Sequence, residues 1–290
     1  MKQRIELYGH RGARGLFPEN TMVGFAGALR IGVDALELDV GVTADDVVVV
    51  THDARLNPDI TRDGRNGAWL SGPTPAIRSL QAVQLGVYDV GRIRSGSAYA
   101  AEHPDQEPQD GARIPQLAEV LGIDPVVRFI IELKSFPLHT DLTVSGAEMG
   151  EAVISVADAC RVTGRIIVQS FDWRGPRHLC RTRPDLPVSW LTSAATLMAA
   201  RSWWDGPDPS DFGGSVPRAV AAEGGPMWGP DFRDLNKDTL EEAHDLGLKV
   251  VPWTVNRPQD MRRLIRWGVD GLITDRPDLA RCVLAEAEAT

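Results

Sequence analysis

Short apolar runs rich in β-forming residues alternate along the chain with segments whose apolar residues recur at helical spacing. Helical spacing is clearest over residues 20–31, 145–161 and 257–267. Such alternation is typical of βαβ units on a parallel sheet, and eight strands with helices between them predict an α/β protein, a (β/α)8 TIM barrel. The predicted strands are residues 4–9, 34–40, 127–134, 165–170, 187–191, 226–230, 248–254 and 269–274.

The alternation is interrupted between residues 53 and 112, which are rich in Gly, Pro, Asp and Arg. Only the stretch near Ile77–Leu85 is helix-like there. Because a structureless loop of that length is uncommon inside a compact domain, we expect one barrel domain over residues 1–290, with 53–112 as a small cap subdomain inserted after the second strand. A second irregular stretch, 201–230, is predicted to be a long loop.

Composition and charge narrow the class of partner. Hydrophobic residues make up 43% and charged residues 24%, which is ordinary for a globular protein. The net charge is −9 without a block of Lys and Arg, so nucleic acid and anionic membranes would be repelled at long range. No apolar run approaches the roughly 18 residues of a membrane span. We therefore expect a small-molecule partner and no stable membrane insertion; the sequence leaves the oligomeric state open.

The cysteines and the amino end bear on location. Cys160, Cys180 and Cys282 form no C-x-x-C pair and lie in stretches of helical apolar spacing, which favours buried free thiols in a reducing compartment. The amino-terminal sequence MKQRIELYGHRG lacks the apolar segment of a signal peptide. We expect a cytoplasmic protein, or a periplasmic one if a signal peptide has been removed ahead of Met1.

Charged residues occupy alternate positions in two predicted strands, Glu37 with Asp39 and Glu132 with Lys134. Since side chains alternate along a strand, each pair lies on one face and can point into the barrel mouth, where TIM barrels carry their active sites. Three carboxylates that converge there would repel one another unless a cation lies between them. Oxygen ligands favour Mg²⁺, Ca²⁺ or Mn²⁺ over zinc.

Two histidines lie at further predicted strand ends. His10 and Arg11 follow the first strand, and His52 follows the apolar run VVVVT. Combined with the acidic residues and Lys134, they fit a site that holds a divalent metal, binds a phosphate and transfers protons at neutral pH.

Five segments of the chain form recognisable motifs. They are HRGARGLFPENT (10–21), ELD (37–39), THD (51–53), ELK (132–134) and the carboxyl-terminal WTVN with DGLITDRP (253–256 and 270–277). These segments closely resemble the glycerophosphodiester phosphodiesterase family, and the resemblance spans nearly the whole chain. The segment ARIPQLAEVL (112–121) is also similar to the one that closes this family's insertion. The resemblance implies a barrel with an inserted cap and metal-dependent hydrolysis of glycerophosphodiesters to glycerol 3-phosphate and an alcohol.

The resemblance assigns a role to each matching position of this chain. It implies divalent-metal ligands, Mg²⁺ or Ca²⁺, at Glu37, Asp39 and Glu132. It implies that His10 and His52 are the acid/base pair and that Arg11 and Lys134 bind the phosphate. It also implies attack by the neighbouring glycerol hydroxyl, with a cyclic phosphate that water opens.

Further residues are predicted at the rim of the site. Trp253 resembles the family's aromatic residue that packs on the glycerol or the leaving group, and Phe171 is expected to wall the pocket. Asn20 is expected either to cap the first helix or to contact the substrate. The chain departs from the family in the cap, where NPDITRDG (57–64) has the single threonine Thr61 in place of a pair.

Two alternative functions remain open. The Trp-rich stretch around Trp203 and Trp204 suggests a lysophospholipase D-like activity on lysophospholipids. A non-catalytic barrel that holds a divalent metal is the other alternative, although every reactive position is filled.

Overall fold

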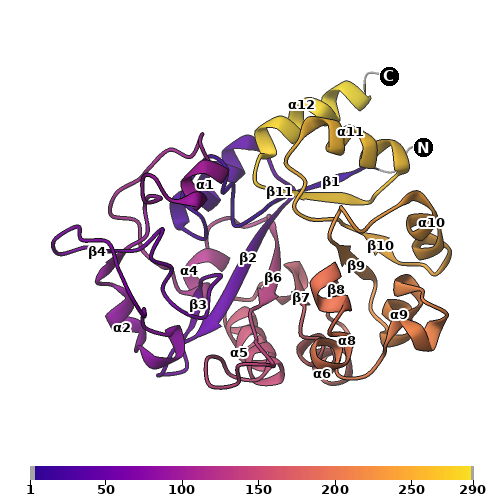
Figure 1. Ribbon diagram of the computed structural model, residues 1–290, viewed down its shortest axis with the longest axis horizontal. Coiled ribbons are helices and arrows are strands. Elements are labelled where there is room, and N and C mark those ends of the chain that lie inside the picture. The colour runs from indigo at the N-terminus through magenta and orange to yellow at the C-terminus, as the bar shows by residue number, and fades with distance from the viewer. Residues whose placement is uncertain (1–3, 289–290) are drawn as a thin grey trace.

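Eight parallel strands form the wall of a nearly closed barrel in the computed structural model, which describes residues 4–288 (Figure 1). Hydrogen-bonded neighbours follow the order β10-β9-β8-β7-β6-β2-β1-β11. The ring closes through Ile273, whose N–H donates to Pro252 O at 3.1 Å and whose carbonyl accepts from Val255 N at 2.9 Å. The eight predicted strands are thereby confirmed. Their bounds are β1 Glu6–Gly9, β2 Ala35–Val42, β6 Arg128–Leu133, β7 Ile166–Ser170, β8 Val188–Thr192, β9 Met227–Pro230, β10 Lys249–Val250 and β11 Gly271–Thr274.

A helix follows each barrel strand before the next one begins, and these helices surround the strands (Figure 1). The predicted TIM barrel is therefore confirmed. The helices are α1 Met22–Ile31, α4 Leu117–Leu121, α5 Gly146–Ala159, α6 Arg174–Thr182, α9 Val216–Glu223, α10 Lys237–Asp245, α11 Pro258–Trp267 and α12 Pro277–Glu288.

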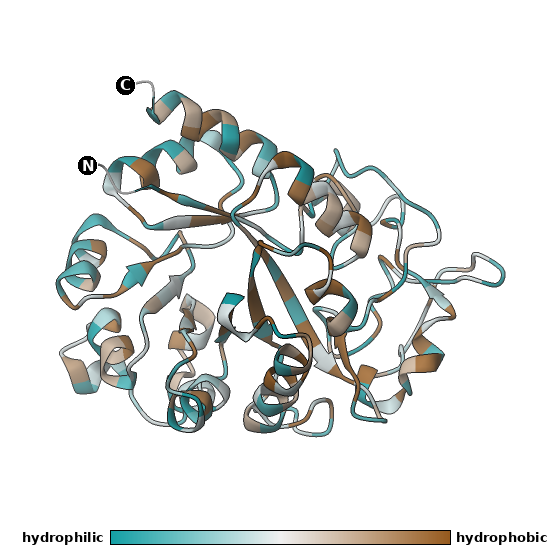
Figure 2. Cartoon of the chain, turned by 180° about the vertical axis from the view of Figure 1, so that it is seen from behind, coloured by the Kyte–Doolittle hydropathy of each residue, from teal (hydrophilic) through white to brown (hydrophobic). Residues whose placement is uncertain are grey.

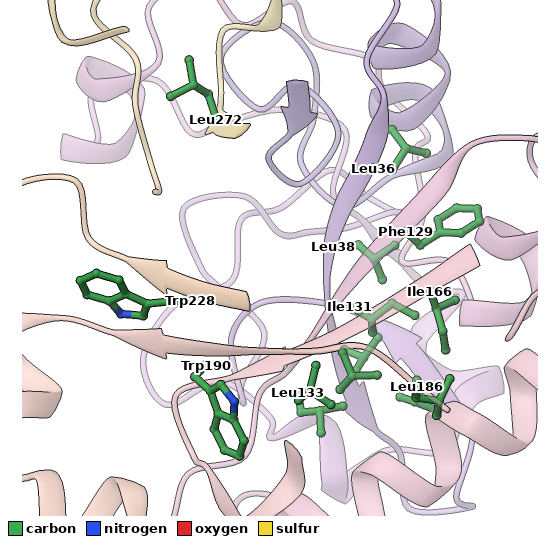
Figure 3. Close-up of a cluster of buried hydrophobic side chains, with 14 of the residues drawn as sticks. Leu36, Leu38, Phe129, Ile131, Leu133, Ile166, Leu186, Trp190, Trp228 and Leu272 are labelled. Carbon is green, nitrogen blue, oxygen red and sulfur yellow. The ribbon is translucent and has the colours of Figure 1, made fainter. Parts of the chain in front are cut away.

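Successive side chains of each strand point to opposite sides, so one set packs against the helices and the other faces the barrel interior. Leu36 and Leu38 point away from the barrel axis into the layer beneath the helices, together with Phe129 and Ile131 (Figure 3). The strands are largely hydrophobic, whereas the surrounding helices carry mixed hydrophobic and hydrophilic residues (Figure 2). The residues between the outward ones, such as Ile130, face a second, smaller cluster inside the barrel. Polar residues at alternate positions near the strand ends therefore project into the mouth.

The polypeptide does not enter the segment 53–112 directly from the second barrel strand. β2 extends to Val42, turns, and pairs with the antiparallel strand β3. The segment 53–112 therefore follows the second barrel strand through one hairpin, because the run VVVVT forms β3 outside the barrel ring. The further elements are β3 Val48–Val50, β4 Arg62–Asp63, η1 Ile77–Ser79, α2 Ala82–Leu85, β5 Tyr88–Asp89 and α3 Ala98–Glu102.

The stretch 201–230 is more regular than the sequence predicted. It contains most of α8 (Ala200–Trp204), η3 (Pro209–Phe212) and α9, and α7 (Ala194–Leu197) precedes it after β8. Trp204 is fully buried, and its ring stacks on Trp173 with centroids 4.0 Å apart. The Trp173 and Trp204 indoles fill the layer between strands and helices, and Trp203 packs against it partly buried, so neither Trp203 nor Trp204 lines the cavity described below.

The cysteines differ partly from expectation. All are free thiols, but Cys282 is exposed, and Cys160 and Cys180 are only half-buried. Within residues 4–288, no helix is long and apolar enough to cross a membrane. Met1 lies outside the described residues.

Candidate active site

Three acidic side chains meet at the carboxyl end of adjacent strands. Glu37 and Asp39 project from β2, and Glu132 projects from β6 beside them, since Asp39 and Glu132 are partners in the β2–β6 register. One carboxylate oxygen from each lies within 4.8 Å of the others. All three side chains are buried. The sequence-predicted acidic cluster is therefore assembled in space.

The acidic cluster fits a divalent cation. Burial, with Asp39 and Glu132 close by, raises the pKa of Glu37 well above its usual value. Burial acts in the same direction on Asp39, but Arg11 and Lys134 outweigh it and lower its pKa. Asp39 Oδ1 is buried without a hydrogen-bond partner, which leaves it available as a ligand. A set of hard oxygens with one unpaired buried member suits Mg²⁺ or Ca²⁺.

Two cations flank the acidic cluster. Lys134 Nζ lies 2.7 Å from Glu132 Oε1 and 3.5 Å from Asp39 Oδ1. Arg11 Nε lies 3.1 Å from Asp39 Oδ2, and its Nη1 donates to Glu19 Oε1 at 2.9 Å. Both cations are buried apart from a tenth of each side chain. They place positive charge where a phosphate group would meet the carboxylates.

His10 is held by a carboxylate from the last strand end. Its Nδ1 lies 2.6 Å from Asp275 Oδ1. Burial lowers the pKa of His10 to about 4 even though Asp275 opposes the shift, so the imidazole is neutral at pH 7. Asp275 stays ionised because His10 and Arg14 outweigh burial and keep its pKa well below the usual value. Nδ1–H therefore donates to Asp275, and Nε2, 3.9 Å from Glu37 Oε2, faces the acidic cluster without a proton.

His52 reaches the same mouth from outside the barrel ring. The β2–β3 hairpin turns back so that Thr51 N donates to Asp39 O at 2.9 Å, which brings His52 to the level of the acidic cluster. His52 Nδ1 lies 2.7 Å from Asp53 Oδ1, and Asn57 Nδ2 donates to Asp53 Oδ2 at 2.9 Å. His52 thus has the same arrangement as His10, a carboxylate at Nδ1 and a free Nε2.

These side chains surround a cavity of about 160 Å³. An aromatic pair forms its apolar side: Phe171 and Trp253 pack edge to face with centroids 5.3 Å apart, and Trp253 Nε1 donates to Gly229 O at 2.9 Å. Every predicted site residue except Asp39, which lies buried beside the acidic partners, lines this cavity. The lining residues are His10, Arg11, Arg14, Glu37, His52, Glu132, Lys134, Gln169, Phe171, Leu191, Trp253, Thr254 and Ile273.

Asn20 does not cap the first helix, which was one of its two expected roles. Thr21 is the N-cap, and its hydroxyl accepts from Gly24 N at 3.1 Å. Asn20 has a left-handed backbone (φ 52°), and its Nδ2 donates to Asp39 Oδ2 at 2.9 Å. The amide therefore orients a carboxylate of the acidic cluster, a role that its position before the helix concealed.

Sequence reasoning also missed Asp275 and left Glu19 without a clear role. Asp275 follows the last strand in the segment TDRP, so the rule that found His10 and Asp39, a polar residue closing an apolar strand, could have found it. Glu19, which binds Arg11, lies in an irregular loop where no periodicity indicates direction.

A TIM barrel whose mouth joins a buried acidic cluster, two cations and two carboxylate-backed histidines belongs to the class of enzymes that transfer protons on an anionic substrate. Residues 10–279 match the model of the glycerophosphoryl diester phosphodiesterase family. The chain belongs to this family, and it is a phosphoric diester hydrolase that acts on glycerophosphodiesters.

Individual relatives agree with this assignment. The chain is 29% identical to the glycerophosphodiester phosphodiesterase of Bacillus subtilis, over 95% of this chain and 85% of that protein. A crystal structure from Silicibacter pomeroyi, provisionally assigned as a glycerophosphoryl diester phosphodiesterase, is 39% identical with a TM-score of 0.89, covering 98% and 94% of the chains. A phosphodiesterase of Oleispira antarctica, solved with its product sn-glycerol-3-phosphate, shares the fold at 18% identity with a TM-score of 0.71, covering 97% and 96%.

Proposed function

We propose that the chain hydrolyses glycerophosphodiesters to glycerol 3-phosphate and an alcohol, with Mg²⁺ or Ca²⁺ held by Glu37, Asp39 and Glu132. The observation that carries the proposal is the convergence of this acidic cluster with two carboxylate-backed histidines around one cavity. The product bound in the Oleispira antarctica phosphodiesterase supports glycerol 3-phosphate as the product. When bound, the cation would offset the charge that grows on the phosphoryl oxygens.

In this proposal Arg11 and Lys134 bind the phosphate. Both side chains line the cavity and already neutralise carboxylates beside it, so they are fixed before a substrate arrives. The edge-to-face pair Phe171 and Trp253 supplies the apolar wall for the carbon skeleton of the glycerol or the alcohol. The diester is thus oriented with its charge toward the acidic cluster and its carbons toward the aromatic rings.

His10 and His52 transfer the protons. The neighbouring glycerol hydroxyl attacks phosphorus as the Nε2 of one neutral imidazole accepts its proton. The other imidazole enters this step protonated on both nitrogens and donates its Nε2 proton to the leaving alcohol. Water then opens the cyclic phosphate as the two proton transfers reverse. The intramolecular attack is favoured because the nucleophile is already positioned. Asp275 and Asp53 keep each Nδ1 protonated, so that Nε2 is the reactive nitrogen.

Residues 53–112 form an inserted cap in this proposal, and substitutions of the cap residues beside the active-site cavity change the preference among alcohol groups while leaving metal binding intact. Leu56, Ile77 and Leu85 pack together with Val49 of β3, which fixes the first part of the segment beside His52. Asp53, Asn57 and other cap residues line a smaller cavity next to the main one.

The proposal is tested by turnover of glycerophosphocholine and lysophosphatidylcholine with Mg²⁺ or Ca²⁺, before and after chelation. We expect release of choline and glycerol 3-phosphate from the first substrate, little turnover of the second, and loss of activity with EDTA. Preferential turnover of lysophosphatidylcholine would replace the proposal with a lysophospholipase D. Metal binding without turnover of either substrate would indicate a non-catalytic barrel.

A further inference from the structure

One tyrosine of the segment 53–112 makes side-chain hydrogen bonds with the loop that carries the phosphate-binding arginine. Tyr99 lies in α3, where it is partly buried. Its hydroxyl contacts Glu19 Oε2 and lies 3.2 Å from Arg14 Nη1. Both partners belong to the loop between β1 and α1, which also holds His10 and Arg11.

The chemistry of the partners fixes the direction of both hydrogen bonds. A guanidinium can only donate, so Arg14 donates to the tyrosine oxygen. The carboxylate of Glu19 is ionised, since Arg11 and Arg14 outweigh burial and lower its pKa, and it can only accept. The hydroxyl of Tyr99 therefore accepts from one loop residue and donates to the other, a pattern that neither phenylalanine nor a charged side chain can reproduce.

The two partners of Tyr99 lead to different parts of the active site. Glu19 Oε1 binds Arg11 at 2.9 Å, and Arg11 in turn lies beside Asp39. Arg14 binds Asp275 through two contacts of 3.0 Å, its Nε to Oδ1 and its Nη2 to Oδ2. The Tyr99 hydroxyl thus connects two series of contacts. One leads through Glu19 to Arg11, and the other leads through Arg14 and Asp275 to His10.

Further contacts fasten the region around Tyr99 to the barrel. His103 packs against the Tyr99 ring, centroids 4.9 Å apart, and Gln106 Nε2 donates to Arg14 O at 2.8 Å. Arg276, next to Asp275, forms an ion pair of 2.7 Å with Asp105. This region is therefore docked at the mouth, although the residues that line the main cavity come from the barrel and its loops.

We propose that Tyr99 is a positioning residue, through which the inserted segment holds Arg11 and His10 in the geometry needed for phosphodiester hydrolysis. This inference rests on the function proposed above. It differs from selection of the alcohol, because Arg11 and His10 act on the phosphate and on proton transfer, which every diester substrate shares. Loss of the hydroxyl is therefore expected to affect all alcohol groups equally.

The test is Tyr99→Phe, which keeps the ring and its contact with His103 but removes the hydroxyl. We expect kcat/KM to fall on the order of tenfold, since small displacements of positioned groups reduce rates strongly. The factor should be the same for glycerophosphocholine and glycerophosphoethanolamine. In the Glu19→Gln background, Tyr99→Phe should cost much less than in the wild type, because the two residues act through one contact.

The matched control is Tyr88→Phe. Tyr88 lies in β5 of the same inserted segment, and its side chain packs with the cluster around Ile77, away from Glu19 and Arg14. We expect this variant to retain the wild-type kcat/KM. A similar loss in both variants would show that any weakening of the segment lowers activity, and the proposal would be wrong.

Two readouts do not require turnover. Calorimetry with inorganic phosphate should show weaker binding to Tyr99→Phe than to wild type and Tyr88→Phe, and hydrogen exchange in residues 10–19 should be faster in that variant alone. Unchanged exchange overturns the inference, as does an activity loss that depends on the alcohol. A wild-type protein that turns over no glycerophosphodiester contradicts the proposed function instead, and the exchange comparison then still decides the role of Tyr99.

Discussion

At the scale of single residues, the active site depends on the tautomers of two imidazoles. His10 and His52 come from unrelated parts of the chain, yet each has a carboxylate within 2.7 Å of its Nδ1. A neutral imidazole carries one proton, so a carboxylate at Nδ1 holds that proton there and leaves Nε2 as the acceptor. The matched pair suits a reaction in which one Nε2 accepts a proton while the other, protonated in turn, delivers one.

His10→Ala and His52→Ala are each expected to lower kcat by on the order of 10² or more, because each removes one of two linked proton transfers. The double variant should be far from additive, since either loss already interrupts the sequence. Steady-state kinetics with glycerophosphocholine and a divalent metal checks this. Near wild-type turnover in one single variant would show that its histidine is structural.

Asp275→Asn is expected to lower kcat by on the order of 10² or more, because a neutral amide no longer fixes the Nδ1 proton of His10. Asp278→Asn is the control: Asp278 pairs with Arg276 on the same segment without touching His10, and its variant should retain activity. Rates of the two variants are compared on one substrate. Equal rates would contradict the role of Asp275.

At the scale of elements, the loop between β1 and α1 packs closely against α1, the helix that follows it. Gly12 has a positive φ of 88°, and a Cβ at this position would lie 2.8 Å from the backbone carbon of Gly24 in α1. Arg11 beside it also has a left-handed backbone (φ 50°), with its N–H donating to Glu37 Oε2 at 3.0 Å. The close approach of loop and helix is what directs Arg11 into the mouth.

Gly12→Ala is expected to lower the free energy of unfolding by more than about 2 kcal/mol, because it combines left-handed strain with a backbone clash. Gly67→Ala is the control, since Gly67 also has a positive φ (72°) but no atom within 4 Å of the added Cβ. That variant should lose only about 1 kcal/mol. Urea unfolding of both variants measures the difference. Equal losses of unfolding free energy would show that the close approach of Gly12 to Gly24 adds no penalty.

At the scale of the whole molecule, the acidic cluster forms only in the folded barrel, where β2 and β6 pair. Asp39 and Glu132 are far apart in the sequence and become neighbours through the β2–β6 ladder. In the folded state, burial and the neighbouring Asp39 and Glu132 raise the pKa of Glu37, so the cluster favours a cation that compensates its charge. A cation that binds it therefore binds the native fold and not the unfolded chain.

Mg²⁺ or Ca²⁺ is expected to raise the midpoint of thermal unfolding, by the equivalent of about 2.7 kcal/mol at a hundredfold excess over Kd. Glu37→Gln should abolish the increase, because it removes a charged ligand oxygen. Glu151→Gln, on the surface of α5, is the control and should preserve it. Calorimetry with and without EDTA checks the effect, and a midpoint indifferent to metal would contradict the site.

The sequence by itself determined the barrel and most of the candidate site. The hydrophobic period of each run predicts strand or helix locally, and the alternation in a strand places Glu37 and Asp39 on one face whatever the rest of the chain does. The positions of His10 and Lys134 follow from the strand-end rule, because barrel strands deliver their closing residues to one mouth, whereas Trp253 was indicated by the family resemblance.

Only the tertiary structure decided the contacts that cross between elements. Asp275 reaches His10 because β1 and β11 are neighbours in the ring, and no local pattern encodes that pairing. Asn20 has a left-handed backbone and hydrogen-bonds to Asp39. Tyr99 contacts Glu19 because an irregular segment docks on the barrel. Periodicity specifies the direction of side chains within an element, whereas loops have no period, so their contacts are set by packing alone.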